Sequence, residues 1–204
     1  MTKIKICGIT NLEDALLAAD LGVDALGFIF AKSPRQITPA KVLEISRKLP
    51  PFISRVGVFV DAFPENINSV ADICGLDIIQ LHGSESPEQI QRFKKKVIKA
   101  FRIKSVADLE EFPAYKVDAY LLDSYSSELP GGTGKTFDWK LALEAKKFGR
   151  PIILSGGLTP ENVAEAIKIT GPYAVDASSG VEERPGKKDK EKLKRFVEAI
   201  RSVI

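Results

Sequence analysis

The stretch Pro151-Ile152-Ile153-Leu154-Ser155-Gly156-Gly157-Leu158-Thr159-Pro160 contains one complete transition from a buried strand to a helix. Residues 151–154 are continuously apolar, as in a parallel strand covered on both faces. Gly156 and Gly157 indicate a turn. Thr159 before Pro160 is typical of a helix start, because the hydroxyl caps an amide and proline lacks the amide hydrogen that would otherwise stay unpaired. This stretch predicts a strand followed by a covering helix.

The same unit recurs along the whole chain at a spacing of roughly 20 to 32 residues, the length of one strand, one helix and short loops. Apolar runs of strand type cover residues 4–6, 25–30, 53–60, 76–81, 97–101, 119–122, 151–154 and 173–175. Eight such units predict an α/β fold, a single-domain (β/α)8 TIM barrel with short loops over residues 1–204. An open doubly wound sheet is the alternative, although it more often has five or six strands.

Three local signals refine this prediction. Thr10 followed by Glu13 matches a capping box at the first helix. A short helix is expected over 105–112, where Pro113 ends it. The basic stretch 186–190 is expected to be a solvated entry to the last helix. The apolar face of that helix has the residues Leu193, Phe196, Val197 and Ile200.

The composition of the 204 residues excludes several classes of protein. Apolar residues make up 44%, enough for a substantial core, and a net charge of +3 is too small to indicate nucleic acid binding. No apolar run is long enough to span a membrane, and the first residues lack a signal peptide. Two cysteines cannot form a disulfide framework, and one histidine leaves little material for a transition metal site. A cytoplasmic protein without metal is expected.

In a barrel of this kind, residues that follow the strands meet on one face, where active sites lie. The polar or glycine residues at these positions are Cys7, Lys32 to Arg35, Asp61, His82, Arg102, Asp123, Gly156 and Gly157, and Ser178, Ser179 and Gly180.

The loops after the seventh and eighth strands fit a phosphate site, where glycines let backbone amides approach an anion. Gly156, Gly157, Ser178 and Ser179 would form it, and two ordinary tight turns are the alternative. The glycine-rich stretch 129–136 is not a P-loop, because Leu129 stands where that motif needs its first glycine. It is expected to be a mobile loop over the site or a plain flexible connection.

Cys7 and Asp123 could reach one ligand from different sides. A base role for Cys7 requires nearby positive charge, and a small buried hydrophobe is the alternative. Asp123 could equally be a loop cap or ion-pair member. Arg35 offers a planar match to a carboxylate, His82 is a ligand or a structural histidine, and Asp176 is expected to order the loops beside the phosphate.

Six blocks in this order resemble the phosphoribosylanthranilate isomerase family over most of the chain. They are Lys5-Ile6-Cys7-Gly8-Ile9-Thr10, Gln80-Leu81-His82-Gly83, Leu122-Asp123-Ser124, the block 131–139, Leu154-Ser155-Gly156-Gly157-Leu158 and the block 175–182, with Pro185-Gly186-Lys187-Lys188-Asp189 after them. The resemblance implies a barrel enzyme of tryptophan biosynthesis without metal or cofactor. It would convert N-(5-phosphoribosyl)anthranilate into 1-(o-carboxyphenylamino)-1-deoxyribulose 5-phosphate by an Amadori rearrangement.

Roles follow from this resemblance residue by residue. Cys7 would be the general base, Asp123 the general acid and Arg35 the ligand of the anthranilate carboxylate. The phosphate would bind Gly156, Gly157, Ser178 and Ser179. From their positions rather than from the resemblance, His82 and Asp176 are expected to be further substrate contacts. A non-catalytic phosphosugar-binding barrel, or another ribose-phosphate isomerase or epimerase, is the alternative. The sequence leaves monomer and homodimer equally open.

Overall fold

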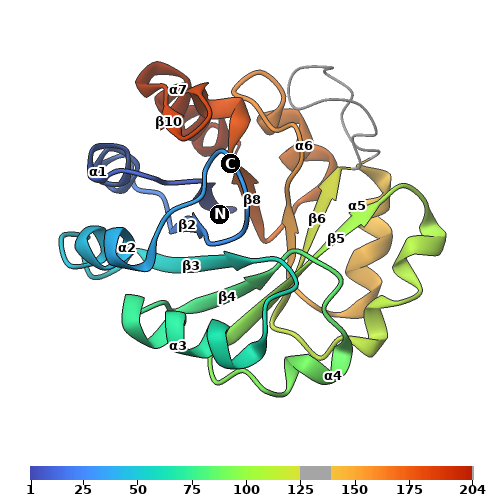
Figure 1. Ribbon diagram of the computed structural model, residues 1–204. Coiled ribbons are helices and arrows are strands. Elements are labelled where there is room, and N and C mark those ends of the chain that lie inside the picture. Colours follow the sequence, from blue (N-terminus) through green and yellow to red (C-terminus); the bar gives the residue numbers. More distant parts are fainter. Residues whose placement is uncertain (125–138, 204) are drawn as a thin grey trace.

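Eight parallel strands form a closed ring in the computed structural model, which describes residues 1–124 and 139–203 (Figure 1). Each strand pairs with the next along the chain, and β8 pairs with β1 to close the barrel. The strands are β1 (Lys3–Cys7), β2 (Ala25–Ile29), β3 (Ser54–Phe59), β4 (Ile78–Leu81), β5 (Lys96–Ile103), β6 (Ala119–Ser124), β7 (Ile152–Leu154) and β8 (Ala174–Ala177). The predicted (β/α)8 barrel and its eight strands are confirmed.

The helices lie outside this ring and cover the strands (Figure 1). They are α1 (Leu12–Asp20), α2 (Pro39–Ser46), α3 (Pro64–Cys74), α4 (Pro87–Ile90), α5 (Lys140–Ala145), α6 (Val163–Thr170) and α7 (Lys190–Arg201). Between β5 and β6 the predicted short helix is replaced by two 3-10 turns, η1 (Val106–Leu109) and η2 (Phe112–Ala114). Pro113 lies inside η2, where its missing amide hydrogen prevents a longer α-helix. Another 3-10 turn, η3 (Lys146–Phe148), follows α5.

Helix starts follow the sequence signals in part. Thr38 before Pro39 caps α2 by accepting a hydrogen bond from the Lys41 amide. The capping box at Thr10 is wrong: Asn11 caps α1 instead, because the Thr10 hydroxyl donates to the carbonyl of Gly186 at 2.5 Å. The helix α6 begins at Val163 rather than at Pro160, after a turn in which the Thr159 amide donates to the Asn162 side chain.

Two apolar layers hold the barrel together. The outer layer lies between strands and helices. Within it, the fully buried Phe112 ring stacks on Phe101 at 4.2 Å and meets Tyr120 at 4.6 Å. The predicted apolar face of α7 is also buried there. The inner layer fills the middle of the barrel and has the residues Ile98, Ala100, Ala119, Leu121, Ile153 and Ala174.

A small hairpin after β8 is absent from the sequence-based prediction. After the 3-10 turn η4 (Ser179–Val181), β9 (Glu182–Arg184) and β10 (Lys187–Lys188) pair in antiparallel fashion. The expectation that 186–190 is solvated is wrong for Lys188, whose side chain is 0% exposed. The hairpin turns this side chain toward Glu182 and the carbonyl groups at the ends of β1 and β8, where the ammonium finds acceptors.

Within 1–124 and 139–203, every helix is too short or too polar to cross a membrane.

The aromatic cluster under η2 gives a test of the outer layer. Phe112→Ala should lower the free energy of unfolding by about 3–5 kcal/mol, because it removes a buried ring and leaves a cavity. Phe63→Ala removes the same ring from a side chain that is 73% exposed, and it should cost less than about 0.5 kcal/mol. Urea denaturation of both variants measures the difference. Equal losses would contradict the described packing.

Candidate active site

A cavity of about 340 Å³ opens at the carboxyl ends of the barrel strands. All nine residues that the sequence singled out line it: Cys7, Arg35, His82, Asp123, Asp176, Gly156, Gly157, Ser178 and Ser179. They come from six strands or the loops that follow them, and barrel closure brings them together. Asp61 and Arg102, also noted at strand ends, line a neighbouring cavity that shares His82.

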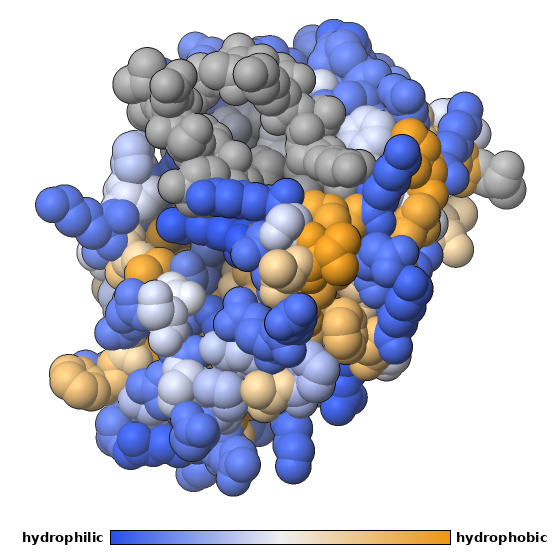
Figure 2. All heavy atoms as spheres, turned by 90° about the vertical axis from the view of Figure 1, so that its right-hand side faces the viewer, coloured by the Kyte–Doolittle hydropathy of each residue, from blue (hydrophilic) through white to orange (hydrophobic). Residues whose placement is uncertain are grey.

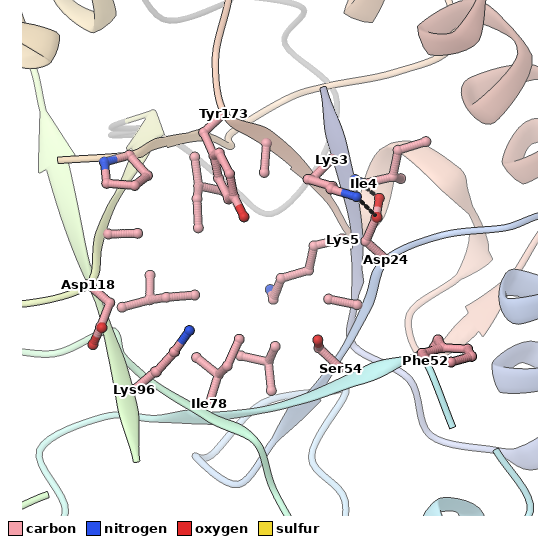
Figure 3. Close-up of a pocket in the computed structure, with 17 residues that line it drawn as sticks. Lys3, Ile4, Lys5, Asp24, Phe52, Ser54, Ile78, Lys96, Asp118 and Tyr173 are labelled. Carbon is pink, nitrogen blue, oxygen red and sulfur yellow. Dashed lines mark hydrogen bonds and ion pairs between the residues drawn. The ribbon is translucent and has the colours of Figure 1, made fainter. Parts of the chain in front are cut away.

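A wider cavity of about 480 Å³ opens at the opposite, amino-terminal end of the barrel (Figure 3). Its wall is mostly apolar, with Lys3, Lys5, Lys96 and Tyr173 among the polar or aromatic side chains around it. Active sites of this fold lie at the carboxyl ends of the strands. The smaller cavity, which holds the nine candidates, is therefore the candidate active site.

The thiol of Cys7 is buried at the end of β1. Gly27 lies beside it on β2, where a Cβ atom would stand 2.7 Å from the sulfur, so the glycine makes room for the thiol. Burial raises the pKa of the Cys7 thiol, while the ammonium groups of Lys5 and Lys188 act in the opposite direction. The positive charge that a cysteine base requires is thus present at this thiol.

Lys5 connects the floor of this site to Asp176. Its Nζ donates to Oδ2 of Asp176 at 2.8 Å, and the two side chains are only 4% and 5% exposed. Burial acts most strongly and lowers the pKa of Lys5, but Asp176 and Cys7 together outweigh it, so the pKa lies above its usual value. Burial also raises the pKa of Asp176, and Lys5 offsets only part of that effect. The second carboxylate oxygen, Oδ1, has no hydrogen-bond partner within residues 1–124 and 139–203.

A hydrogen-bonded chain runs from Gln80 through His82 to Asp123. The amide nitrogen of Gln80 lies 3.0 Å from Nδ1 of His82, and Nε2 of His82 lies 3.2 Å from Oδ2 of Asp123. With the Gln80 amide nitrogen as donor, Nδ1 is an acceptor, so Nε2 carries the proton and donates to the carboxylate. His82 therefore orients the carboxyl group of Asp123, and Gln80 in turn orients His82.

The loops after β7 and β8 pack tightly against each other. Gly156 and Gly157 have φ angles of 81° and 68°, which favour glycine. A Cβ atom on Gly180 would overlap the carbonyl group of Leu158, so only glycine allows this approach. The hydroxyl of Ser178 is buried between the loops without a hydrogen-bond partner. The arrangement offers backbone amides and a free hydroxyl to an anion.

Unpartnered polar atoms concentrate in this cavity. Among the described side chains, four buried nitrogen or oxygen atoms lack a hydrogen-bond partner: Ser46 Oγ, Gln80 Oε1, Asp176 Oδ1 and Ser178 Oγ. The last three belong to residues that line the candidate site. Because an unpaired buried polar atom costs about 1–3 kcal/mol, such atoms are rare and need an explanation. A polar ligand bound in this cavity would supply such partners.

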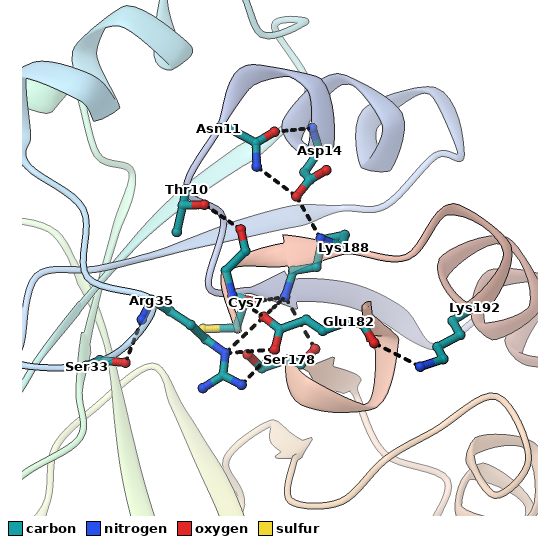
Figure 4. Close-up of polar contacts among 11 residues, drawn as sticks. Cys7, Thr10, Asn11, Asp14, Ser33, Arg35, Ser178, Glu182, Lys188 and Lys192 are labelled. Atoms are coloured by element: carbon teal, nitrogen blue, oxygen red, sulfur yellow. Dashed lines mark hydrogen bonds and ion pairs between the residues drawn. The ribbon is translucent and has the colours of Figure 1, made fainter. Parts of the chain in front are cut away.

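Arg35 reaches the cavity from the loop after β2 and is held by Glu182 (Figure 4). Nε of Arg35 donates to Oε1 of Glu182 at 2.9 Å and Nη2 to Oε2 at 2.7 Å. Nζ of Lys188 donates to the same Glu182 carboxylate at 2.9 Å and to the carbonyl of Cys7 at 2.6 Å. These contacts connect Arg35, the end of β1 that carries Cys7, and the hairpin that follows β8.

Four residues of this site were missed from the sequence: Lys5, Gln80, Glu182 and Lys188. The first two had a signal, because residues two apart on a strand share a face, and Lys5 and Gln80 precede Cys7 and His82 by two. Glu182 and Lys188 had none, since their burial depends on the hairpin.

Two further expectations concern the glycine-rich stretch and metal ligands. The glycine-rich stretch 129–136 lies outside the described residues. Within the part of the chain that the structure does describe, no group of three or more His, Cys, Asp or Glu side chains could hold a metal ion.

Comparison with known proteins places these features in a family. The family model described as N-(5'phosphoribosyl)anthranilate (PRA) isomerase matches residues 4–199. An N-(5'-phosphoribosyl)anthranilate isomerase from Geobacter sp. (strain M21) is 57% identical over 198 residues, which cover 97% of each chain.

Two solved structures are also similar over nearly the whole chain. A phosphoribosyl anthranilate isomerase in complex with reduced 1-(o-carboxyphenylamino)-1-deoxyribulose 5-phosphate has a TM-score of 0.90 and 44% identity. A Thermotoga maritima enzyme described as dimeric, solved as monomers, has a TM-score of 0.89 and 43% identity. Each comparison covers 99% of this chain and 100% of the other.

The buried ion pair beneath the thiol can be tested by stability. Lys5→Met should lower the free energy of unfolding by about 3–5 kcal/mol, because it leaves the Asp176 carboxylate buried and unpaired. Lys3→Met is the matched control on the same strand: Lys3 pairs with Asp24 but is 53% exposed, so we expect a loss below about 1 kcal/mol. Urea denaturation near pH 7 measures both. A Lys5→Met protein as stable as Lys3→Met would contradict a charged, buried pair.

Proposed function

This chain belongs to the N-(5'-phosphoribosyl)anthranilate isomerase family, and we propose that Cys7 and Asp123 are the general base and general acid of its reaction. The enzyme acts in tryptophan biosynthesis and converts N-(5-phosphoribosyl)anthranilate into 1-(o-carboxyphenylamino)-1-deoxyribulose 5-phosphate. The three unpartnered polar atoms in one cavity carry the site proposal: Gln80 Oε1 and Asp176 Oδ1 would accept from ligand hydroxyls, and the Ser178 hydroxyl would donate to a phosphate. The whole of residues 1–204 would act as one catalytic domain.

Two anchors would hold the substrate. The phosphate would bind the loops after β7 and β8, through amides at Gly156, Gly157 and Ser179 and the free hydroxyl of Ser178. The anthranilate carboxylate would pair with Arg35, which lines the same cavity and still has free donors.

The ribose would lie between these anchors. Oδ1 of Asp176 has no hydrogen-bond partner among the described residues, so it would accept a hydrogen bond from a ribose hydroxyl. His82 would contact the substrate beside Asp123, whose carboxyl it orients. Anchors at both ends convert binding into orientation of the reacting carbons.

The first chemical step would open the sugar ring. Asp123 donates a proton to the ring oxygen, the bond from that oxygen to C1′ breaks, and the anthranilate nitrogen forms a Schiff base with C1′. The acid must stand where it can reach the ring oxygen, and the contact with His82 fixes the carboxyl in one orientation.

The second step would move hydrogen from C2′ to C1′. The Cys7 thiolate removes the C2′ proton, the electrons shift toward the nitrogen, and an enolamine forms. Protonation at C1′ and loss of the proton from the C2′ hydroxyl then give the ketone at C2′. Lys5 and Lys188 support the thiolate, since both oppose the effect of burial on the pKa of Cys7.

We also propose the compartment and the assembly of the enzyme. The free thiols of Cys7 and Cys74 fit the reducing cytoplasm. The relative described as dimeric supports a homodimer. We place its interface at the amino-terminal end of the barrel, where an exposed ring borders a mostly apolar cavity. Phe52 is 95% exposed at the rim of the 480 Å³ cavity, whose wall is mostly apolar (Figure 3). Burying such a ring in a second copy removes apolar surface from water.

Replacement of the two reacting side chains tests the chemistry. Cys7→Ala and Asp123→Asn should each lower kcat by about 10²–10⁴-fold, since each removes one proton transfer. The assay follows the loss of fluorescence of the anthranilate substrate, and circular dichroism checks the fold. Cys74→Ala is the control, because it removes a thiol far from the cavity and should leave kcat within about twofold. A Cys7→Ala enzyme with near-normal kcat would end the base assignment.

Light scattering after size-exclusion chromatography tests the assembly. Phe52→Asp should convert a dimer of the wild type into monomers, because a charge in an apolar interface is costly. Phe63→Asp is the matched control, since Phe63 is also exposed but precedes α3 at the opposite end of the barrel. The Phe63→Asp protein should remain a dimer. A monomeric wild type, or a dimeric Phe52→Asp protein, would disprove this interface.

A further inference from the structure

We propose that Glu182 is a positioning residue that selects which edge of the Arg35 guanidinium faces the substrate carboxylate. The proposal rests on the proposed role of Arg35 as ligand of that carboxylate. It explains why an arginine meant to bind an anion is already engaged by one inside the protein (Figure 4).

The geometry of the pair leaves one binding edge free. Arg35 has five N–H donors in a planar fork. Glu182 accepts from Nε and from Nη2, which together form the lateral edge of the guanidinium. The terminal edge, with donors on Nη1 and Nη2, stays available for a second carboxylate. The guanidinium is planar and its lateral edge is held at two points, so its plane cannot rotate. A second carboxylate can therefore bind only at the terminal edge, in that plane.

Glu182 is itself held by a buried cation. The ammonium of Lys188 donates to Glu182, to the carbonyl of Cys7 and, at 3.3 Å, to the carbonyl of Ser178. Its three hydrogens therefore meet three acceptors. The Lys188 ammonium therefore connects Glu182 to the end of β1, which carries Cys7, and to the loop after β8, which carries Ser178.

The surrounding backbone has little freedom to move. Gly8, at φ 77°, has no side chain, and a Cβ atom there would lie 2.6 Å from Cδ of Arg35. The arginine therefore packs directly over the end of β1. The Gly186 amide donates to Glu182, and the Lys188 amide donates to Asp14 of α1, which fixes the hairpin on the barrel. Glu182 has one position available to it.

Charge alone does not explain this arrangement. Arg35, Glu182 and Lys188 together carry one net positive charge. Without the Glu182 carboxylate the cluster would carry two, and by attraction alone it would bind an anion more tightly. Burying three charges is also a weak source of stability compared with apolar packing. What the carboxylate adds is a fixed orientation of the guanidinium.

The test compares two ligands on each variant. One is reduced 1-(o-carboxyphenylamino)-1-deoxyribulose 5-phosphate, and the other is its counterpart without the ring carboxyl. Calorimetry gives the ratio of the two Kd values, which measures carboxylate recognition alone. We expect the wild type to prefer the carboxylated ligand by at least about tenfold. Glu182→Gln should reduce that preference about tenfold, although it raises the local positive charge, and it should change the Kd of the other ligand less than about twofold.

Two more variants make the result decisive. Glu182→Asp keeps the charge but is one methylene shorter, so it should also lose preference, and it serves if Glu182→Gln does not fold. Glu44→Gln, which breaks an exposed pair on α2, should behave like the wild type. An unchanged or larger preference in the folded Glu182 variants overturns the positioning role. If Arg35→Ala keeps the full preference, the proposed role of Arg35 fails instead, so the two failures are distinguishable.

Discussion

The parallel pairing of β8 with β1 is the constraint on which the candidate site depends. Ile4 pairs with Val175 and Lys5 with Asp176, although some 170 residues separate them in the chain. This closure places the thiol of Cys7 beside the loop of Ser178. An open sheet would leave these strands at opposite edges, and no local sequence feature could bring them together. The cavity is therefore a product of topology, and its chemistry is a product of which side chains face inward at the carboxyl ends of the strands.

Buried ion pairs cluster at the carboxyl ends of the strands, where they serve geometry more than stability. Each of three buried lysines donates to one buried carboxylate, in the pairs Lys5 with Asp176, Lys99 with Glu85 and Lys188 with Glu182. Such pairs contribute little net stability, because desolvation offsets the attraction between the charges. Their acceptors include backbone carbonyls next to the site, such as those of Cys7 and Gly83. A charged group with several directional bonds holds a strand end more firmly than apolar contacts, which have no preferred direction.

The sequence predicted what depends on local rules. Eight apolar runs were sufficient for the barrel. The rule that residues at strand ends meet on one face located the cavity of the nine candidates, although it also selected Asp61 and Arg102, which line the neighbouring cavity. Two errors arose where a distant partner decided the outcome. Thr10 bonds to Gly186 rather than capping α1, and Lys188 is buried rather than solvated, because the β9–β10 hairpin folds back onto the end of β1. A lysine in a basic run carries no sign of burial, since its acceptors are mostly carbonyl groups, which every residue has.

Substrate anchoring and the strength of the base are linked in the proposed reaction. Burial already raises the pKa of Cys7, and a bound phosphate and carboxylate would raise it further, since negative charge disfavours a thiolate. The cation of Arg35 and the amides of the glycine loops oppose that effect, because they neutralise the two anions where they bind. The anchors would then do more than orient the sugar. They would also limit the rise in the pKa of Cys7 while the substrate is bound, so that the thiol can still ionise. Lys5 and Lys188 remain beside the thiol throughout, so the substrate adds its charges to a site that already holds the opposing ones.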